Sequence, residues 1–182
     1  MKRMAFLVLN PNVDLVERGL PLKPFNSEEV TNRIKSLVIR CKYEKIPVVY
    51  VTDSHTKLDR EFEIEGFRVH ALRGTDGEQI IRELKGYEDY IVCKRCFNGF
   101  LGTDLDLYLR EEGIEKVIVT GGLINLDVRF TCVDAYQRRY KVIVLTDCLY
   151  ADSEDRLNRI IREMFFTKRV TSEEFISWIK YL

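Results

Sequence analysis

Several polar or ionisable side chains lie at or shortly after the ends of apolar runs of the chain, where they could form a binding or catalytic cleft. They are Asn10, Asp53, His55, Lys94 and Asp127. In an open parallel sheet, ligands bind just beyond the carboxyl ends of the strands, so these side chains could converge on one cleft. Each also has a structural interpretation, because an Asn or Asp at a strand end is often a turn or cap residue and a lone Lys is usually solvated.

Short apolar runs that alternate with amphipathic segments predict the elements that would position these groups. Runs rich in β-branched residues predict strands at 5–9, 46–52, 90–93, 116–120 and 141–146. Because each run is nearly all apolar, we expect strands buried on both faces, as in a parallel sheet covered by helices. Amphipathic segments predict helices at 26–44, 77–84, 103–113, 126–139, 153–165 and 172–181.

Length and charge narrow the class of protein. The chain has 182 residues without a linker or repeat, so we expect one domain over 1–182. Its 29 basic and 29 acidic residues cancel, which predicts neither a nucleic-acid partner nor an anionic membrane partner. No apolar run approaches the roughly 20 residues that span a bilayer, and the first residues do not form a signal peptide. We therefore expect a cytoplasmic protein.

Ordered sequence segments then carry a resemblance to a known family. They lie at 5–10, 48–55, 70–77, 94–105, 119–131 and 170–174, and include Asp-x-His at 53–55 and His-x-x-x-Gly-Thr-x-Gly at 70–77. With these segments the whole chain resembles the isochorismatase-like family, which includes nicotinamidases and related cysteine amidohydrolases. The resemblance implies a three-layer, doubly wound α/β fold with a six-stranded, mostly parallel sheet. It also implies a homo-oligomer, either a dimer or a tetramer.

The resemblance places Asn10, Lys94 and Asp127 at the catalytic positions, where cysteine hydrolases carry Asp, Lys and Cys. Two of the three residues differ. Asn10 cannot accept a proton near neutral pH, and a carboxylate at 127 is a far weaker nucleophile toward amides than a thiolate. Isochorismatases proper protonate a vinyl ether with the first Asp, which Asn10 also replaces. We therefore expect neither reaction in its known form.

Three expectations about this degenerate site follow from the resemblance. Lys94 and Asp127 should form an ion pair that keeps the carboxylate charged. The backbone around Leu123 and Asp127 should supply the oxyanion-binding amides. The Gly122–Leu123 peptide bond should be cis.

The only two histidines of the chain also occupy family positions. In nicotinamidases the corresponding pattern, here Asp53, His55 and His70, supplies one carboxylate and two imidazoles to a divalent metal such as zinc. The alternative is a structural role, because relatives that are not nicotinamidases keep Asp-x-His for hydrogen bonding. The sequence thus makes zinc a candidate cofactor and establishes none.

The five cysteines suggest other chemistry. Their odd number in a chain of this size fits reduced thiols better than a disulfide framework. Cys132 follows Asp127 on the same predicted helix, and we assign it to core packing. Cys96 lies two residues after Lys94, a cation that could lower its pKa, so a relocated nucleophile is an alternative. Cys93 and Cys96 also have the spacing of a redox or metal pair, although Cys93 is expected to be buried.

These observations lead to one leading hypothesis and one alternative. The leading hypothesis is a family member that has lost cysteine-hydrolase activity and binds an unknown small molecule or acts as an oligomeric scaffold. The alternative is an active hydrolase of a small amide or ester that uses Asp127 or a metal-activated water. Substrate choice would depend on the loops at 55–70 and 95–102.

Overall fold

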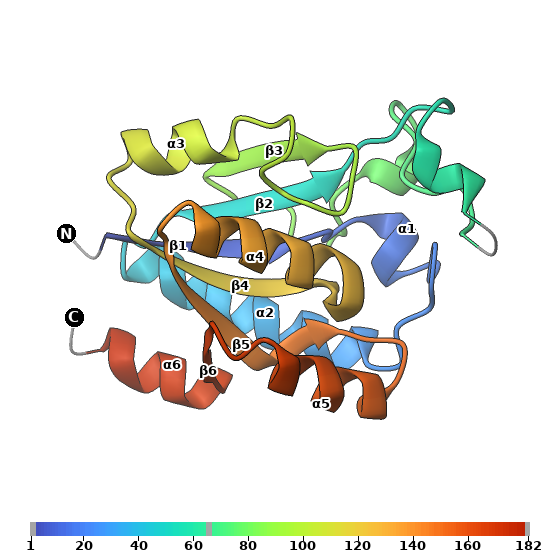
Figure 1. Cartoon of the computed structure of the whole chain (residues 1–182). Helices are drawn as coiled ribbons and strands as arrows, with labels where there is room; N and C mark the ends of the chain where they lie inside the picture. Colours follow the sequence, from blue (N-terminus) through green and yellow to red (C-terminus); the bar gives the residue numbers. More distant parts are fainter. Residues whose placement is uncertain (1–2, 65–66, 181–182) are drawn as a thin grey trace.

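Six strands form one sheet. The structure is a computed structural model that describes residues 3–64 and 67–180. All strand pairs are parallel, and the order is β3-β2-β1-β4-β5-β6 (Figure 1). The strands are β1 Met4–Leu9, β2 Val48–Asp53, β3 Tyr90–Lys94, β4 Lys116–Leu123, β5 Lys141–Tyr150 and β6 Lys168–Val170. The predicted doubly wound parallel sheet is confirmed.

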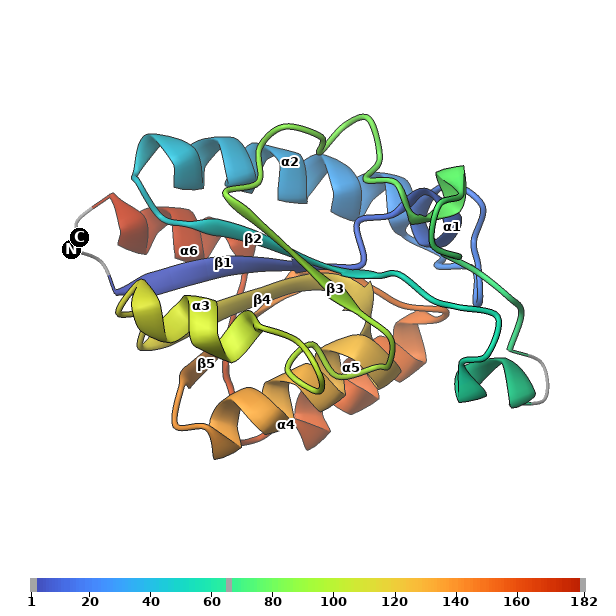
Figure 2. The same cartoon turned by 90° about the horizontal axis from the view of Figure 1, so that it is seen from above.

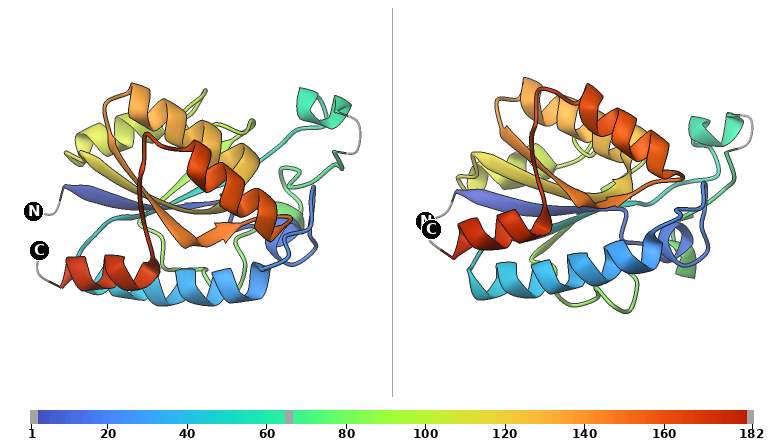
Figure 3. Two further views of the ribbon diagram at one scale, coloured as in Figure 1. Left: turned by 60° about the horizontal axis from the view of Figure 1, so that its bottom comes forward. Right: turned by 90° about the horizontal axis from the view of Figure 1, so that it is seen from below.

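Helices cover both faces of the sheet and enclose two apolar cores (Figures 2 and 3). One face packs against α2 Ser27–Tyr43 and α6 Ser172–Ile179. The other packs against α3 Leu105–Glu111, α4 Arg129–Gln137 and α5 Glu154–Glu163. Alternate residues of each central strand point into opposite cores, which is why these strands are apolar throughout. Within the described part of the chain, no helix is both long enough and apolar enough to span a bilayer.

The strand predicted at 90–93 is not buried on both faces. It forms β3 at the edge of the sheet, where Val92 is buried while Ile91 and Cys93 are exposed. Alternating side chains point to opposite faces, and only one face of this strand is covered. The expectation that Cys93 is buried was therefore wrong.

The helix predicted at 77–84 is also absent. A single 3₁₀ turn, η2 Asp76–Glu78, is followed by backbone pairing with the loop after β1. Val13 donates its N–H to the Gln79 carbonyl, and Ile81 donates to the Pro11 carbonyl. These tertiary hydrogen bonds replace the helical ones.

Shorter elements that the periodicity did not predict lie near the strand ends. They are the one-turn helix α1 Val13–Val16, the 3₁₀ turn η1 Arg60–Glu63, the strand β6 and the π-helical segment η3 Ile124–Val128. The segment η3 replaces the first turn of the helix predicted at 126–139. It joins β4 to α4 and carries Asp127, and π-helical insertions are frequent at functional sites.

Candidate functional site

The predicted site residues lie at the carboxyl edge of the sheet, on either side of the point where the strand order reverses between β1 and β4. Asn10 follows β1, Asp53 ends β2, Lys94 ends β3 and Asp127 lies in η3. All four side chains are buried. Strands far apart in the sequence thus bring an amide, an ammonium and two carboxylates together.

Lys94 is the centre of this cluster. Its ammonium donates to a carboxylate oxygen of Asp53 and, over 2.8 Å, to Oδ1 of Asp127. The predicted pair with Asp127 is therefore present, together with a second partner that the sequence did not indicate. Asn10 binds Asp53 twice: its Nδ2 donates to Oδ2 over 2.7 Å, and its Oδ1 accepts the Asp53 backbone N–H over 3.0 Å.

The two carboxylates that share this ammonium have pKa values shifted in opposite directions. Burial raises the pKa of Asp127, and the nearby Asp53 charge raises it further, against the opposing effect of Lys94. Burial would also raise the pKa of Asp53, but Lys94 and the two histidines hold it well below its ordinary value. The predicted ion pair is present, but Lys94 does not fully offset the effects of burial and of the Asp53 charge on the pKa of Asp127.

Asp127 also binds the backbone amide that was expected to face a reaction oxyanion. Its Oδ2 accepts the N–H of Leu123 over 3.1 Å. The preceding turn is made by Gly121 and Gly122, with φ of +73° and +48°. A Cβ on Gly121 would lie 2.4 Å from the Leu9 carbonyl oxygen, so only glycine fits where β4 passes β1. The Gly122–Leu123 bond is trans, which corrects the expectation of a cis peptide there.

The two histidines lie on the other side of Asp53, with ligand atoms of all three residues within 4.8 Å of one another. His55 Nε2 is 3.7 Å from Asp53 Oδ1, and His70 Nε2 is 3.5 Å from Oδ2. The opposite ring nitrogens have their own partners: His55 Nδ1 lies 2.9 Å from Asp59 Oδ2, and His70 Nδ1 lies 2.9 Å from the Arg68 carbonyl oxygen.

This arrangement fits a zinc ion chemically. Metal-binding histidines typically hold one ring nitrogen in a hydrogen bond to a carboxylate or carbonyl and present the other to the metal. One carboxylate and two imidazoles form a usual zinc set with an open position. Lys94 and Asn10 oppose this use, because both already bind the Asp53 carboxylate.

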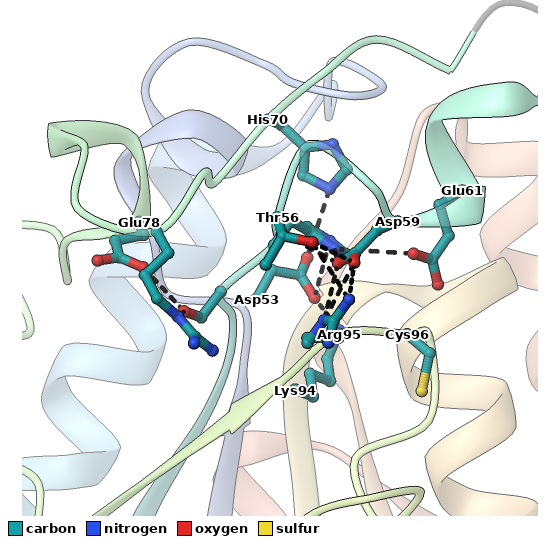
Figure 4. Close-up of polar contacts among 12 residues, drawn as sticks. Asp53, Thr56, Asp59, Glu61, His70, Glu78, Lys94, Arg95 and Cys96 are labelled. Atoms are coloured by element: carbon teal, nitrogen blue, oxygen red, sulfur yellow. Dashed lines mark hydrogen bonds and ion pairs between the residues drawn. The ribbon is translucent and has the colours of Figure 1, made fainter.

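Sequence reasoning missed three charged neighbours, which Figure 4 shows around the cluster. Asp59 binds Arg95, whose Nε lies 3.0 Å from Oδ1, and this contact holds the pKa of Asp59 well below its ordinary value. Glu61 in η1 lies 3.7 Å from His55 Nδ1, and burial raises its pKa. The available sequence signal was the four-residue spacing between His55 and Asp59.

The pocket above Asp127 is nearly closed. Its volume is about 10 Å³, enough for about one water molecule. Its polar lining consists of Asn10, Asp53, His70 and Asp127, and its apolar lining of Leu15, Pro21, Phe67, Phe97, Leu123 and Leu126. A wider groove of about 680 Å³ lies on the other side of Asp59 and Glu61 and includes Cys93, Arg95 and Cys96.

Residues 4–174 match the model of the Isochorismatase domain. The chain belongs to the isochorismatase family. An isochorismatase-like hydrolase from Alkaliphilus metalliredigens is similar in structure, with 35% identity, a TM-score of 0.89 and coverage of 96% of this chain and 97% of that one. The uncharacterized isochorismatase family protein YwoC of Bacillus subtilis is 37% identical over 94 residues, half of each chain.

Two further proteins similar to this chain are a nicotinamidase homologue and a pyrazinamidase. A probable inactive nicotinamidase of Arabidopsis thaliana is 26% identical, over 82% of each chain. The pyrazinamidase of Pyrococcus horikoshii, solved in complex with zinc, is 23% identical with a TM-score of 0.83, covering 93% of this chain and 99% of that one. At that identity the pyrazinamidase supports the fold alone.

The cysteines of this isochorismatase-family chain offer no evident replacement nucleophile. All five lie in the described residues, and none forms a disulfide. Cys132 is fully buried, as predicted, and burial raises its pKa. Burial also raises the pKa of Cys96 and outweighs the opposing effect of Lys94. The Cys96 thiol lies 3.5 Å from the Asn98 carbonyl oxygen, in a contact that does not include Lys94.

Proposed function

We propose that this isochorismatase-family protein has lost cysteine-hydrolase chemistry and uses its closed pocket to bind a small molecule. The observation that carries the proposal is the position of the Asp127 carboxylate, which accepts both the Leu123 amide and the Lys94 ammonium. A substrate oxyanion would have to displace this carboxylate from its own donors. The same residue would also have to act as the nucleophile.

Two of the three chemical roles of a cysteine hydrolase lack a competent group. Position 127 carries no thiol. The Asn10 amide is hydrogen-bonded to Asp53, and an amide oxygen is not basic enough to accept a proton near neutral pH. The donors that would stabilise developing charge already bind a full carboxylate, so they are not preorganised for a transition state. The proposal therefore treats the pocket as a binding site and not as a centre for acyl transfer.

The test measures turnover of nicotinamide and of simple carbamoyl substrates by purified protein, with and without a chelator. We expect no ammonia release above the rate of a heat-denatured sample, while an active nicotinamidase in the same buffer serves as the positive control. Turnover that is retained after chelation and after Asp127→Ala would contradict the proposal. A thermal-shift screen of small molecules would then search for the ligand, because a ligand that binds only the folded state raises its stability.

A hydrolase that uses metal-activated water is the second candidate. The observation in its favour is that both Nε2 atoms face Asp53 while both Nδ1 atoms are held by neighbours. Asp53, His55 and His70 would hold the zinc, which would supply Lewis-acid activation of water at this position. Turnover that appears only in zinc-reconstituted protein and disappears in His70→Ala would favour this candidate.

We further propose that the protein acts in the cytoplasm as a homo-oligomer, a dimer or a tetramer. The support is the family resemblance together with the balanced charge of the sequence. Light scattering during size-exclusion chromatography measures the mass directly. A monomer at micromolar concentration would contradict this assembly.

A further inference from the structure

The pocket above Asp127 is lined by negative and neutral groups. The carboxylates of Asp53 and Asp127 contribute to its wall beside Asn10 and His70. Among the described residues that line it there is no lysine or arginine, because the Lys94 side chain is fully buried behind the two carboxylates. A ligand entering this pocket therefore meets acidic groups before it meets the ammonium.

The charges of the site are unequal. Two carboxylates, Asp53 and Asp127, share the single Lys94 ammonium. On the far side of His55, Asp59 and Glu61 are accompanied by one cation, Arg95. Figure 4 shows Asp59 and Glu61 beside Arg95. His55 adds positive charge on that side, because the lowering effect of burial on its pKa is outweighed by its carboxylate neighbours, which raise it. In the pocket itself two buried carboxylates share one ammonium, so a cationic ligand would offset the incompletely compensated negative charge.

Aromatic rings form the outer part of the same pocket. Phe67 and Phe97 lie with ring centroids 5.6 Å apart at an interplanar angle of 84°, and Phe67 lies 5.4 Å from the His70 ring. Two rings at a right angle form a corner beside the carboxylates. Phenylalanine faces attract ammonium groups, and the attraction is strongest where water is excluded.

The pocket is too small for an organic ligand unless part of its wall moves, and the two phenylalanine rings are the part that can move. Its volume of about 10 Å³ holds one water-sized group, so a larger ligand must move a wall. Phe67 and Phe97 are only half-buried, whereas Asp53 and Asp127 are buried. Rotation of interface side chains is common on binding, so the two rings are the part of the wall that can open.

We propose that this pocket binds a small organic cation, a protonated primary amine whose ammonium group contacts Asp127 and Asp53 and whose carbon skeleton packs against Phe67 and Phe97. This inference rests on the proposed binding function and names its ligand class. Asp127 places a negative charge where cysteine hydrolases carry the reacting thiol, which disfavours carboxylate ligands at the same position.

Three probes that share one ring test the sign of the charge. Benzylammonium, benzyl alcohol and benzoate are titrated by calorimetry into protein treated with a chelator. We expect benzylammonium to bind about tenfold more tightly than either of the other two. Asp127→Asn keeps the shape and removes the charge, so it should abolish this preference. Asp155→Asn removes an exposed carboxylate of α5 and is the matched control, which should keep the preference.

Several results would overturn the inference. Equal affinity for the three probes, preference for benzoate, or absence of binding by all three would each do so. Binding of benzylamine only after zinc is added would show ligation to a metal instead of recognition of charge. Because the wild-type protein alone gives the charge series, a folding defect in Asp127→Asn leaves the test intact. Phe97→Leu is the second variant, and it should weaken benzylammonium while retaining its advantage over benzoate.

The two proposals fail separately. Amidase turnover by the wild-type protein would reject the loss of activity, whatever the charge preference. Preference for benzoate without any turnover would reject only the proposal that the ligand is a cation. The assays can be run on the same preparation.

Discussion

Leu123 donates its backbone N–H to the Asp127 carboxylate, over 3.1 Å. The two residues belong to one turn, in which β4 ends at Leu123 and η3 carries Asp127 back toward it. The side chain at position 127 therefore occupies the backbone donor that the family resemblance assigns to a substrate oxyanion. Replacing Asp127 would free this donor, so variants of residues 10 and 127 test the geometry of the site.

The double variant Asn10→Asp, Asp127→Cys should recreate a reactive thiol. The new carboxylate can take the proton of the introduced thiol while Lys94 stabilises the thiolate, because removal of Asp127 frees one of the two contacts of Lys94. Mass spectrometry after brief treatment with iodoacetamide measures alkylation at each cysteine. We expect position 127 to react faster than Cys93, an exposed thiol that serves as the internal reference.

The single variant Asp127→Cys should react much more slowly at position 127, because it lacks a proton acceptor at position 10. Asn10→Asp alone carries no thiol at either position, so it serves as the control for alkylation of the native cysteines. Alkylation at 127 no faster than at Cys93, in a folded double variant, would show that the geometry of the site has changed as well as its groups.

Asp127 should make the folding stability depend on pH. Its pKa is raised in the folded state above the ordinary value of 3.8. The folded protein then holds this proton to higher pH than the unfolded chain, so the stabilising contribution is present below 3.8 and is lost as pH rises through the folded pKa. Asp127→Asn has no such loss.

Melting temperatures of the wild type and of Asp127→Asn, compared across acidic to neutral pH, measure this effect. The difference, variant minus wild type, should become more positive as pH rises from below 3.8. Asp155→Asn controls for the removal of one surface charge. If both variants follow the wild type in parallel, Asp127 does not carry the predicted shift.

Zinc binding should depend on a residue outside the histidine cluster. Asp14 is buried, and its Oδ2 accepts the N–H of Ala71, the residue after His70, over 2.7 Å. We expect reconstituted protein to hold at most one ion per chain and His70→Ala to lose it. Asp14→Asn should weaken zinc about 10- to 100-fold, the usual effect of losing a group that orients a ligand.

Competition with a chromophoric chelator measures the affinity of zinc without any activity assay. Arg18→Gln is the matched control, because Arg18 binds the other oxygen of Asp14 and leaves the Ala71 contact in place. Wild-type protein that fails to hold zinc at micromolar concentration would assign Asp53, His55 and His70 to a structural role.

Two glycines with similar backbone angles should respond very differently to alanine. Gly121 has φ +73°, and a Cβ added there would lie 2.4 Å from the Leu9 carbonyl oxygen. Gly102 has φ +68°, and a Cβ added there would meet no atom within 4 Å. Gly102→Ala should cost only the left-handed strain, about 1–2 kcal/mol. Gly121→Ala adds a backbone clash between β1 and β4. Its free energy of unfolding, measured by urea denaturation, should therefore fall by more than that of Gly102→Ala. Equal losses would contradict the close approach.

The sequence by itself determined the architecture. The nearly all-apolar runs at 5–9, 46–52 and 116–120 indicate strands buried on both faces, as in a parallel sheet between helices. The ends of the predicted strands placed Asn10, Asp53 and Lys94 near one another, which is enough to predict that they share one edge of the sheet. The sequence could not assign the uncovered face of β3, because which strand forms the edge depends on the order of strands and not on their composition.

Only the tertiary structure decided how the charged groups pair. Lys94 and Asp53 are 41 residues apart, and no periodicity indicates that this lysine binds Asp53 as well as Asp127. Burial of Asp127, together with the nearby Asp53 charge, raises its pKa against the lowering effect of Lys94. The contacts of Asp59 with Arg95 and of Gln79 with Val13 are likewise long-range. Residue types therefore predict which groups reach the site, while their pairing and burial set the charge, because electrostatic energies depend on distances that only the folded chain fixes.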